Sequence, residues 1–200
     1  MNKASKIARD KNTREPNLRP ASTPSLPTTP DGFRGRDWLL LMAILGLYFL
    51  MRWPFRELPL IRDEGEYAHM GQVMASGKLP YVDAYNQKPP LVFLWTAFVQ
   101  ALFGNSLSAF RVATNVYGTL ALALWLLFTF RHFGTLAMAA CGLAYCLLGN
   151  QIENMLHQSS TEFYLLLWFA LAILIWFRPW ESRDWLRPLV AGLCVGFAMQ

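Results

Sequence analysis

Long apolar segments separated by short polar ones dominate the chain. The apolar residues run on continuously instead of following one face of an amphipathic helix. They form blocks at Trp38–Phe55, Leu91–Phe103, Ala109–Phe130, Gly134–Leu148 and Phe163–Phe177, and from Leu189 to the last residue. Continuous apolar runs of this kind are typical of membrane helices. The pattern therefore predicts an all-α protein, a polytopic bundle of transmembrane helices.

One of these blocks, Leu91–Phe103, is too short to cross a bilayer comfortably. Its 13 residues would form a helix of about 20 Å, whereas the hydrocarbon core is about 30 Å thick. We expect this segment to lie in the membrane interface as part of a long juxtamembrane-helix loop.

The distribution of basic residues tests this topology independently. Residues 1–36 hold eight basic and three acidic side chains, which accounts for the formal net charge of +5. Further basic residues stand at Arg131 and in the segment with Arg178, Arg183 and Arg187. If Leu91–Phe103 does not span, all three groups lie on the cytoplasmic side, as the positive-inside rule requires. The same rule explains the basic tail without nucleic acid as a partner.

The predicted organisation is a disordered cytoplasmic tail at 1–35, rich in Pro, Ser and Thr, and a membrane domain at 36–200. The spans are expected at about 37–55, 109–130, 134–150, 161–177 and 188–200, with an extracytoplasmic loop at 57–108. The last apolar segment has no flanking charge or cap. We therefore expect the chain to be the N-terminal part of a longer protein, with a short natural variant as the alternative.

The most polar stretch outside the tail lies between two apolar blocks and reads "IRDEGEYAHMGQVMASGKLPYVDAYNQKPP" (61–90). On a helix, Asp63, Tyr67 and Met70 would share one face, with Glu64 on a neighbouring face that leaves it to solvent or to another partner. The simpler interpretation is a charged helix start, because acidic residues favour the positive end of the helix dipole.

Other ionisable residues are expected at the same extracytoplasmic surface as Asp63, namely Lys88, Arg111 and Glu162. Such groups at a membrane boundary are costly unless they are paired or functional. An ion pair between Arg111 and Glu162 is the structural alternative to a functional role. Two prolines follow Lys88 and suit the first turn of a helix. They would fix this lysine at the start of that helix, where its ammonium group suits an anionic lipid head group.

Three stretches in this order carry a family resemblance: the polar stretch above, "FGNSLSAFRVATNVYGTLALALWLLF", and "STEFYLLLWFALAIL". Over about residues 38–200 the chain resembles the N-terminal half of the GT-C class of membrane glycosyltransferases. The resemblance is to the branch shared by protein O-mannosyltransferases and the lipid A aminoarabinose transferase. Its most specific element is an Asp-Glu pair followed some 25 residues later by Lys-Pro-Pro. Gln87, where the aminoarabinose branch often has an acid, and Lys88, where mannosyltransferases have histidine, depart from both patterns.

The resemblance implies an enzyme of the bacterial inner membrane. Such enzymes transfer a hexose or pentose, with inversion, from a polyprenyl (undecaprenyl or dolichyl) monophosphate donor to a lipid, glycan or protein acceptor at the extracytoplasmic face. It implies catalytic carboxylates at Asp63, the general base, and Glu64, contacts to the lipid phosphate from Lys88 and Arg111, and support from Tyr67 and Glu162. The resemblance implies no definite cofactor, and it leaves open whether a divalent cation takes part.

No metal-binding residues are assigned. His69 and His157 are too scattered for a zinc site, and the three cysteines lie in apolar segments. A non-catalytic scaffold or a transporter is the alternative, although transporters usually hold ionisable groups near the bilayer midplane. If the 200 residues are the entire product, an inactive fragment is a further alternative.

Overall fold

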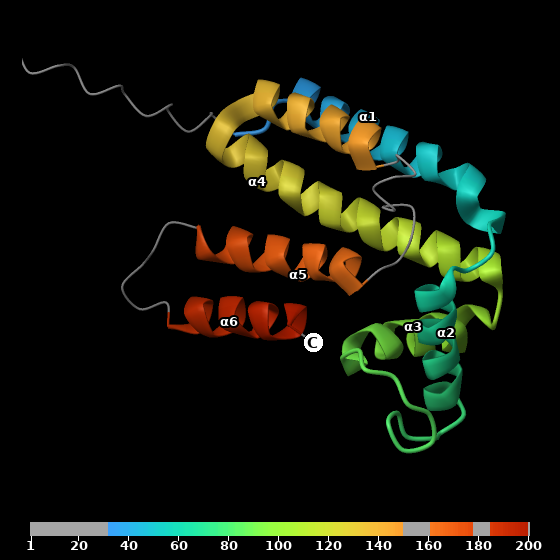
Figure 1. Cartoon of the computed structure of the whole chain (residues 1–200). Coiled ribbons are helices and arrows are strands. Elements are labelled where there is room, and N and C mark those ends of the chain that lie inside the picture. The colour runs from blue at the N-terminus through green and yellow to red at the C-terminus, as the bar shows by residue number, and fades with distance from the viewer. Residues whose placement is uncertain (1–31, 150–160, 178–184, 200) are drawn as a thin grey trace, which may run out of the picture.

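The computed structural model describes residues 32–149, 161–177 and 185–199, and this part of the chain is helical, with no β-strand (Figure 1). The all-α prediction is confirmed. Most of the tail predicted to be disordered lies outside the described residues, as do His157, Arg178 and Arg183. The helices are α1 (Gly35–Arg52), the short 3-10 helix η2 (Trp53–Glu57), α2 (Arg62–Ala75), α3 (Pro90–Phe103), α4 (Leu107–Gly149), α5 (Thr161–Trp176) and α6 (Leu186–Ala198).

Helix α4 consists of two helical segments that reverse direction at Gly134 (Figure 1). This glycine has φ 82° and ψ −176°, a conformation open essentially to glycine alone. The reversal falls at the boundary expected between the apolar segments 109–130 and 134–150. Residues 131–133 separate the expected spans 109–130 and 134–150, yet Arg131 and His132 belong to the helical segment before the reversal.

Helix α1 packs against both segments of α4. Thr135 donates a hydrogen bond of 2.8 Å to the carboxylate of Asp37, and a Cβ added at Gly142 would lie 2.7 Å from Ile44. The second segment of α4 therefore runs parallel to α1, and the first segment runs antiparallel to it. We call the end of the bundle that holds Asp37 and the Gly134 reversal the tail end, and the opposite end the loop end. The shared core consists of Leu41, Ile44, Tyr48, Leu122, Leu126, Phe130, Met138 and Cys146.

Helices α5 and α6 continue the bundle beside the first segment of α4. Tyr117 donates to the carbonyl of Tyr164 at 2.7 Å, and the Trp125 indole donates to the carbonyl of Leu166 at 3.2 Å. Helix α5 thus begins at the loop end. Helix α6 returns alongside it, with the ring of Phe197 packed 5.0 Å from that of Trp168.

Helices α2 and α3 pack on each other at the loop end, where α2 lies across the end of the bundle (Figure 1). Thr96 and Gln100 donate hydrogen bonds to the carbonyls of Tyr67 and Ala68, both at 2.9 Å. Pro90 lies in the first turn of α3, as the sequence predicts, whereas Pro89 is the N-cap just before it.

Two helical stretches, Gly35–Glu57 and Leu107–Gly149, are long and apolar enough to cross a membrane by length and composition. Helices α3, α5 and α6 are shorter apolar helices. Many large apolar side chains, such as Leu39 and Leu136, are exposed on the outside of the bundle. That all the predicted spans cross a membrane stays a prediction.

Candidate functional site

The predicted site residues come from helix beginnings that meet at the loop end. Asp63, Glu64 and Tyr67 lie in the first half of α2, whereas Arg111 lies in the first turns of α4. Lys88 directly precedes Pro89, the N-cap of α3, and Glu162 is the second residue of α5. Four segments that are distant in sequence therefore contribute side chains to one region.

Within this region Glu64 and Arg111 form a buried ion pair. The Arg111 Nη1 and Glu64 Oε1 atoms are 2.6 Å apart, and the side chains are 6% and 0% exposed. The other oxygen of Glu64 accepts the Ile61 N–H at 3.1 Å, and Arg111 also donates to the carbonyls of Leu58 and Pro59. The pair thus fastens the chain before α2 to α4. Of the two alternatives expected for Glu64, solvent or another partner, the structure shows the second, because packing buries the side chain against Arg111.

This pairing changes how two of the predicted residues are interpreted. The Glu64 carboxylate is held by Arg111 and by a backbone N–H, so both of its oxygens are engaged within the protein. The Arg111 guanidinium is bound by a carboxylate and two carbonyls in a buried position. These contacts favour a positioning role for both residues over direct contact with substrate.

Asp63 directly precedes Glu64 on α2 and is only half-buried, and its negative charge acts on the Tyr67 hydroxyl. Burial of that hydroxyl raises the pKa of Tyr67 to about 12. The negative charges of Asp63, Glu162 and Glu66 add to the rise, and a polar contact with Thr161 opposes it. Burial and the charges of these carboxylates therefore both favour the neutral form of this phenol.

Lys88 is held from its backbone by a small polar network. Its N–H donates to Asn86 at 2.9 Å, and its carbonyl accepts the Tyr81 hydroxyl at 2.7 Å. The Asn86 amide in turn donates to Glu66 on α2 at 3.0 Å. Tyr81 adopts φ 68°, a left-handed conformation that is costly for a non-glycine residue. The loop thus keeps Lys88 at a fixed place at the start of α3.

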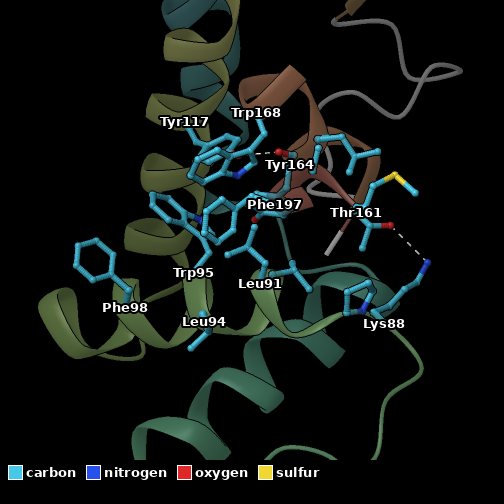
Figure 2. Close-up of a pocket in the computed structure, with 15 residues that line it drawn as sticks. Lys88, Leu91, Leu94, Trp95, Phe98, Tyr117, Thr161, Tyr164, Trp168 and Phe197 are labelled. Carbon is cyan, nitrogen blue, oxygen red and sulfur yellow. Dashed lines mark hydrogen bonds between the residues drawn. The ribbon is translucent and has the colours of Figure 1, made fainter. Parts of the chain in front are cut away.

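The ammonium group of Lys88 lies at the edge of a cavity of about 530 Å³ and 3.5 Å from the Thr161 hydroxyl (Figure 2). Apart from these two groups the lining is mostly apolar and aromatic, with side chains from α3, α4, α5 and α6. It includes Leu91, Trp95, Phe98, Tyr117, Tyr164, Trp168 and Phe197. A cavity of this size and character suits an amphiphile whose apolar part is bound inside and whose anionic group meets the lysine.

Sequence reasoning missed several residues that shape this site. Asn86 and Thr161 carry no motif that marks them, since their roles depend on partners from other helices. The aromatic lining left a weak signal, because Trp95 and Phe98, and likewise Tyr164 and Trp168, recur at helical spacing.

In the described ranges no group of three or more His, Cys, Asp or Glu side chains is placed to hold a metal ion. Comparisons with protein-family models, with curated proteins and with solved structures gave no match to this chain. The function must therefore be inferred from the chemistry of the site.

Proposed function

We propose that this chain forms the donor site of an inverting glycosyltransferase that takes its sugar from a polyprenyl monophosphate at the extracytoplasmic face of a membrane. The observation that carries the proposal is the apolar cavity with Lys88 at its edge. Asp63 precedes it in the chain on α2, and Glu162 follows Thr161, a residue of the cavity lining, on α5. Such a donor has a hydrocarbon chain that matches the apolar cavity, a phosphate that matches Lys88 and a sugar that matches the carboxylates. The resemblance to the GT-C class points to the same chemistry.

The proposed topology places the tail end of the bundle in the cytoplasm. Arg34, Arg36, Arg131 and Arg187 all lie toward that end, in accord with the positive-inside rule. Helix α3, which crosses the end of α4 in Figure 2, would lie in the opposite interface. The 16 residues of α5 and 13 of α6 are short for a span and call for local thinning of the bilayer.

In the proposed reaction Asp63 accepts the proton of the acceptor hydroxyl as that oxygen attacks the anomeric carbon. The bond from this carbon to the phosphate oxygen breaks, and its electron pair goes to the phosphate. Lys88 stabilises the charge that develops on that leaving group. Tyr67, neutral at physiological pH, is able to donate a hydrogen bond to a sugar hydroxyl.

The test uses the chain in proteoliposomes with a panel of undecaprenyl-phosphate-linked hexoses and pentoses and a panel of lipid, glycan and protein acceptors, and measures the undecaprenyl phosphate released. We expect Asp63→Asn to lower the rate by about a hundredfold to ten-thousandfold while donor binding persists. Glu57→Gln, which changes an exposed acid at the same end of the molecule, is the matched control. Unchanged turnover by Asp63→Asn would remove Asp63 from the role of base.

Lys88→Ala should weaken binding of undecaprenyl phosphate, whereas Lys78→Ala should not. Lys78 is an exposed lysine of the same loop and lies away from the cavity lining. Equal affinity in the two variants would refute the assignment of Lys88 to the phosphate.

A further inference from the structure

A separate hollow of about 440 Å³ lies at the tail end of the bundle, opposite to the end that holds Lys88. Figure 1 shows the first segment of α4 between α1 and α5, so α4 forms the floor of this hollow and its two neighbours form the walls. The volume falls within the range of roughly 300–1,000 Å³ that is usual for ligand sites. The lining consists of Phe33, Trp38, Leu124, Leu127, Arg131, Leu171, Leu174 and Ile175, none of which lines the cavity at Lys88.

The floor and walls of the hollow are apolar or aromatic over most of their surface. Its lining residues on α4 stand three and four positions apart, and so do those on α5, which places each set on one face of its helix. On the side of α1, the Phe33 ring packs with its centroid 4.6 Å from that of Trp38 and 3.8 Å from that of Phe130. Such a lining suits a hydrocarbon chain.

Arg131 is the charged residue of this lining, and it is exposed. Arg34 and Arg36 add positive charge at the same end of the bundle. Among the described residues at this end the acid is Asp37, which is 2% exposed. Its carboxylate accepts hydrogen bonds from the Thr135 hydroxyl and the Arg34 N–H, and is thus engaged inside the bundle. The charge beside the hollow is therefore positive.

Exposed aromatic side chains indicate the depth of the hollow in a membrane. Tryptophan in particular is enriched where a membrane protein meets the lipid head groups. Large aromatic side chains with half or more of their surface exposed lie at the tail end, namely Trp38, Phe133, Trp176, Phe177 and Trp185. Because Trp38 also lines the hollow, the proposed topology places the hollow next to the head groups of the cytoplasmic leaflet.

We infer that this hollow binds an anionic phospholipid of the cytoplasmic leaflet. One acyl chain lies over α4 between α1 and α5, and the Arg131 guanidinium binds the phosphate, because its planar set of donors matches phosphate oxygens. Basic pockets between transmembrane helices on the cytoplasmic side are known to bind anionic head groups in this way. The inference rests on the proposed topology and is independent of the proposed transfer reaction.

The head-group part of the site is tested with the full chain purified in a neutral detergent. The chain is titrated with phosphatidylglycerol, which is anionic, and with phosphatidylcholine of the same acyl chains, which is zwitterionic, and bound lipid is counted by native mass spectrometry. Phosphatidylglycerol should bind more tightly, and Arg131→Ala should weaken its binding by about tenfold, the loss expected for a hydrogen bond between charged groups.

Arg36→Ala is the matched control for Arg131→Ala. It removes the same charge at the same end, but the Arg36 side chain is 74% exposed, lies 3.8 Å from Asp37 and is not part of the lining. Its effect on phosphatidylglycerol binding should stay within about threefold. Equal losses in the two variants would show a general attraction to positive charge and would overturn the site, as would equal binding of the two lipids.

The position of the acyl chain is tested by tryptophan fluorescence. Phospholipids with bromine atoms on their acyl chains quench the tryptophans that they contact, and surrounding lipid does so with either head group. An excess of quenching by brominated phosphatidylglycerol over brominated phosphatidylcholine therefore reports the site. Trp38→Phe should abolish this excess, whereas Trp176→Phe, which changes an exposed tryptophan outside the lining, should keep it.

An excess that persists in Trp38→Phe, or its absence from the unaltered chain, would overturn the inference. Neither readout uses the polyprenyl donor. Failure of this lipid site would therefore leave the proposed function intact, and failure of the proposed function would leave the lipid site intact.

Discussion

The buried ion pair of Glu64 and Arg111 allows a prediction about stability that separates these residues from Asp63. Glu64→Gln keeps the size of the side chain but removes its charge. Arg111 would then lose the carboxylate of Glu64 at a site where its side chain is 6% exposed. One oxygen of Glu64 accepts from Arg111 and the other accepts the Ile61 N–H. In glutamine an amide nitrogen, itself a donor, replaces one of these oxygens and would face one of these two donors. The substitution therefore loses both the charge and one hydrogen bond.

The expected magnitude follows from the burial of both partners. Removing one member of a buried pair typically costs about 3–5 kcal/mol, because the remaining charge is left without compensation. With both side chains shielded from water there is little solvent screening to reduce this value. The loss is a large share of the roughly 5–15 kcal/mol that stabilises an ordinary domain. By contrast, Glu57→Gln changes a side chain that is 63% exposed, and we expect a cost of at most about 1 kcal/mol.

The assay is reversible unfolding of the chain in mixed micelles, with the free energy compared among variants. Glu64→Met and Arg111→Met should each be strongly destabilising. The double variant should cost less than their sum by about 2 kcal/mol, because it leaves no lone charge. If Glu64→Gln unfolds within roughly 0.5 kcal/mol of the unaltered chain, or if the two methionine substitutions add, the pair does not hold the loop end as argued.

Two further predictions concern the same helix. Gly71→Ala should destabilise by about 1–3 kcal/mol, because its Cβ would lie 2.5 Å from the Thr96 hydroxyl and 2.8 Å from the backbone of α3. Gly65→Ala, with nothing within 4 Å, should be neutral or stabilising, and equal effects on thermal unfolding would contradict this packing. Because the pKa of Tyr67 is about 12 in the folded chain and about 10 unfolded, the unfolded state loses its proton first. The free energy of unfolding should therefore fall between pH 10 and 12, and Tyr67→Phe should abolish the part of this fall that Tyr67 causes. Asp63→Asn should lower the pH midpoint at which tyrosinate absorbance appears.

The helices could be predicted because apolar runs and glycine or proline positions are local properties of the sequence. The run that ends near Phe130 and resumes after Gly134 marks the reversal of α4, and Pro89 and Pro90 mark the start of α3. The faces of α2 were harder to assign. Successive residues on a helix differ by about 100°, so whether Asp63 or Glu64 faces the core depends on how α2 is rotated against α3.

That rotation is fixed by the close approach at Gly71, where a side chain would meet the α3 backbone. Glu64 lies two helical turns before Gly71 on the same side of α2, which carries it inward to Arg111. The two charged residues are 47 positions apart, and no sequence periodicity relates them. The sequence indicated that Arg111 needs a partner and suggested Glu162, but it could not choose among distant acids. The cavity has the same origin, because its walls come from four helices.

The positions of the charged groups bear on whether the protein catalyses a reaction or transports a solute. Over Trp38–Met51, Val112–Phe130 and Phe163–Phe177 the chain has no Asp, Glu, Lys or Arg, so charges lie at helix ends. A transport pathway would need ionisable groups nearer the midplane.

Arg52 is a charged residue at the loop end that connects two helices. Its guanidinium lies over the rings of Tyr48 and Phe163 at 5.5 and 5.6 Å, and so connects the end of α1 to the start of α5. Together with the pair of Glu64 and Arg111, it fixes the helix beginnings that carry Asp63 and Glu162. A rigid bundle that holds charged groups at one end is in accord with the transfer reaction that we propose at a membrane surface.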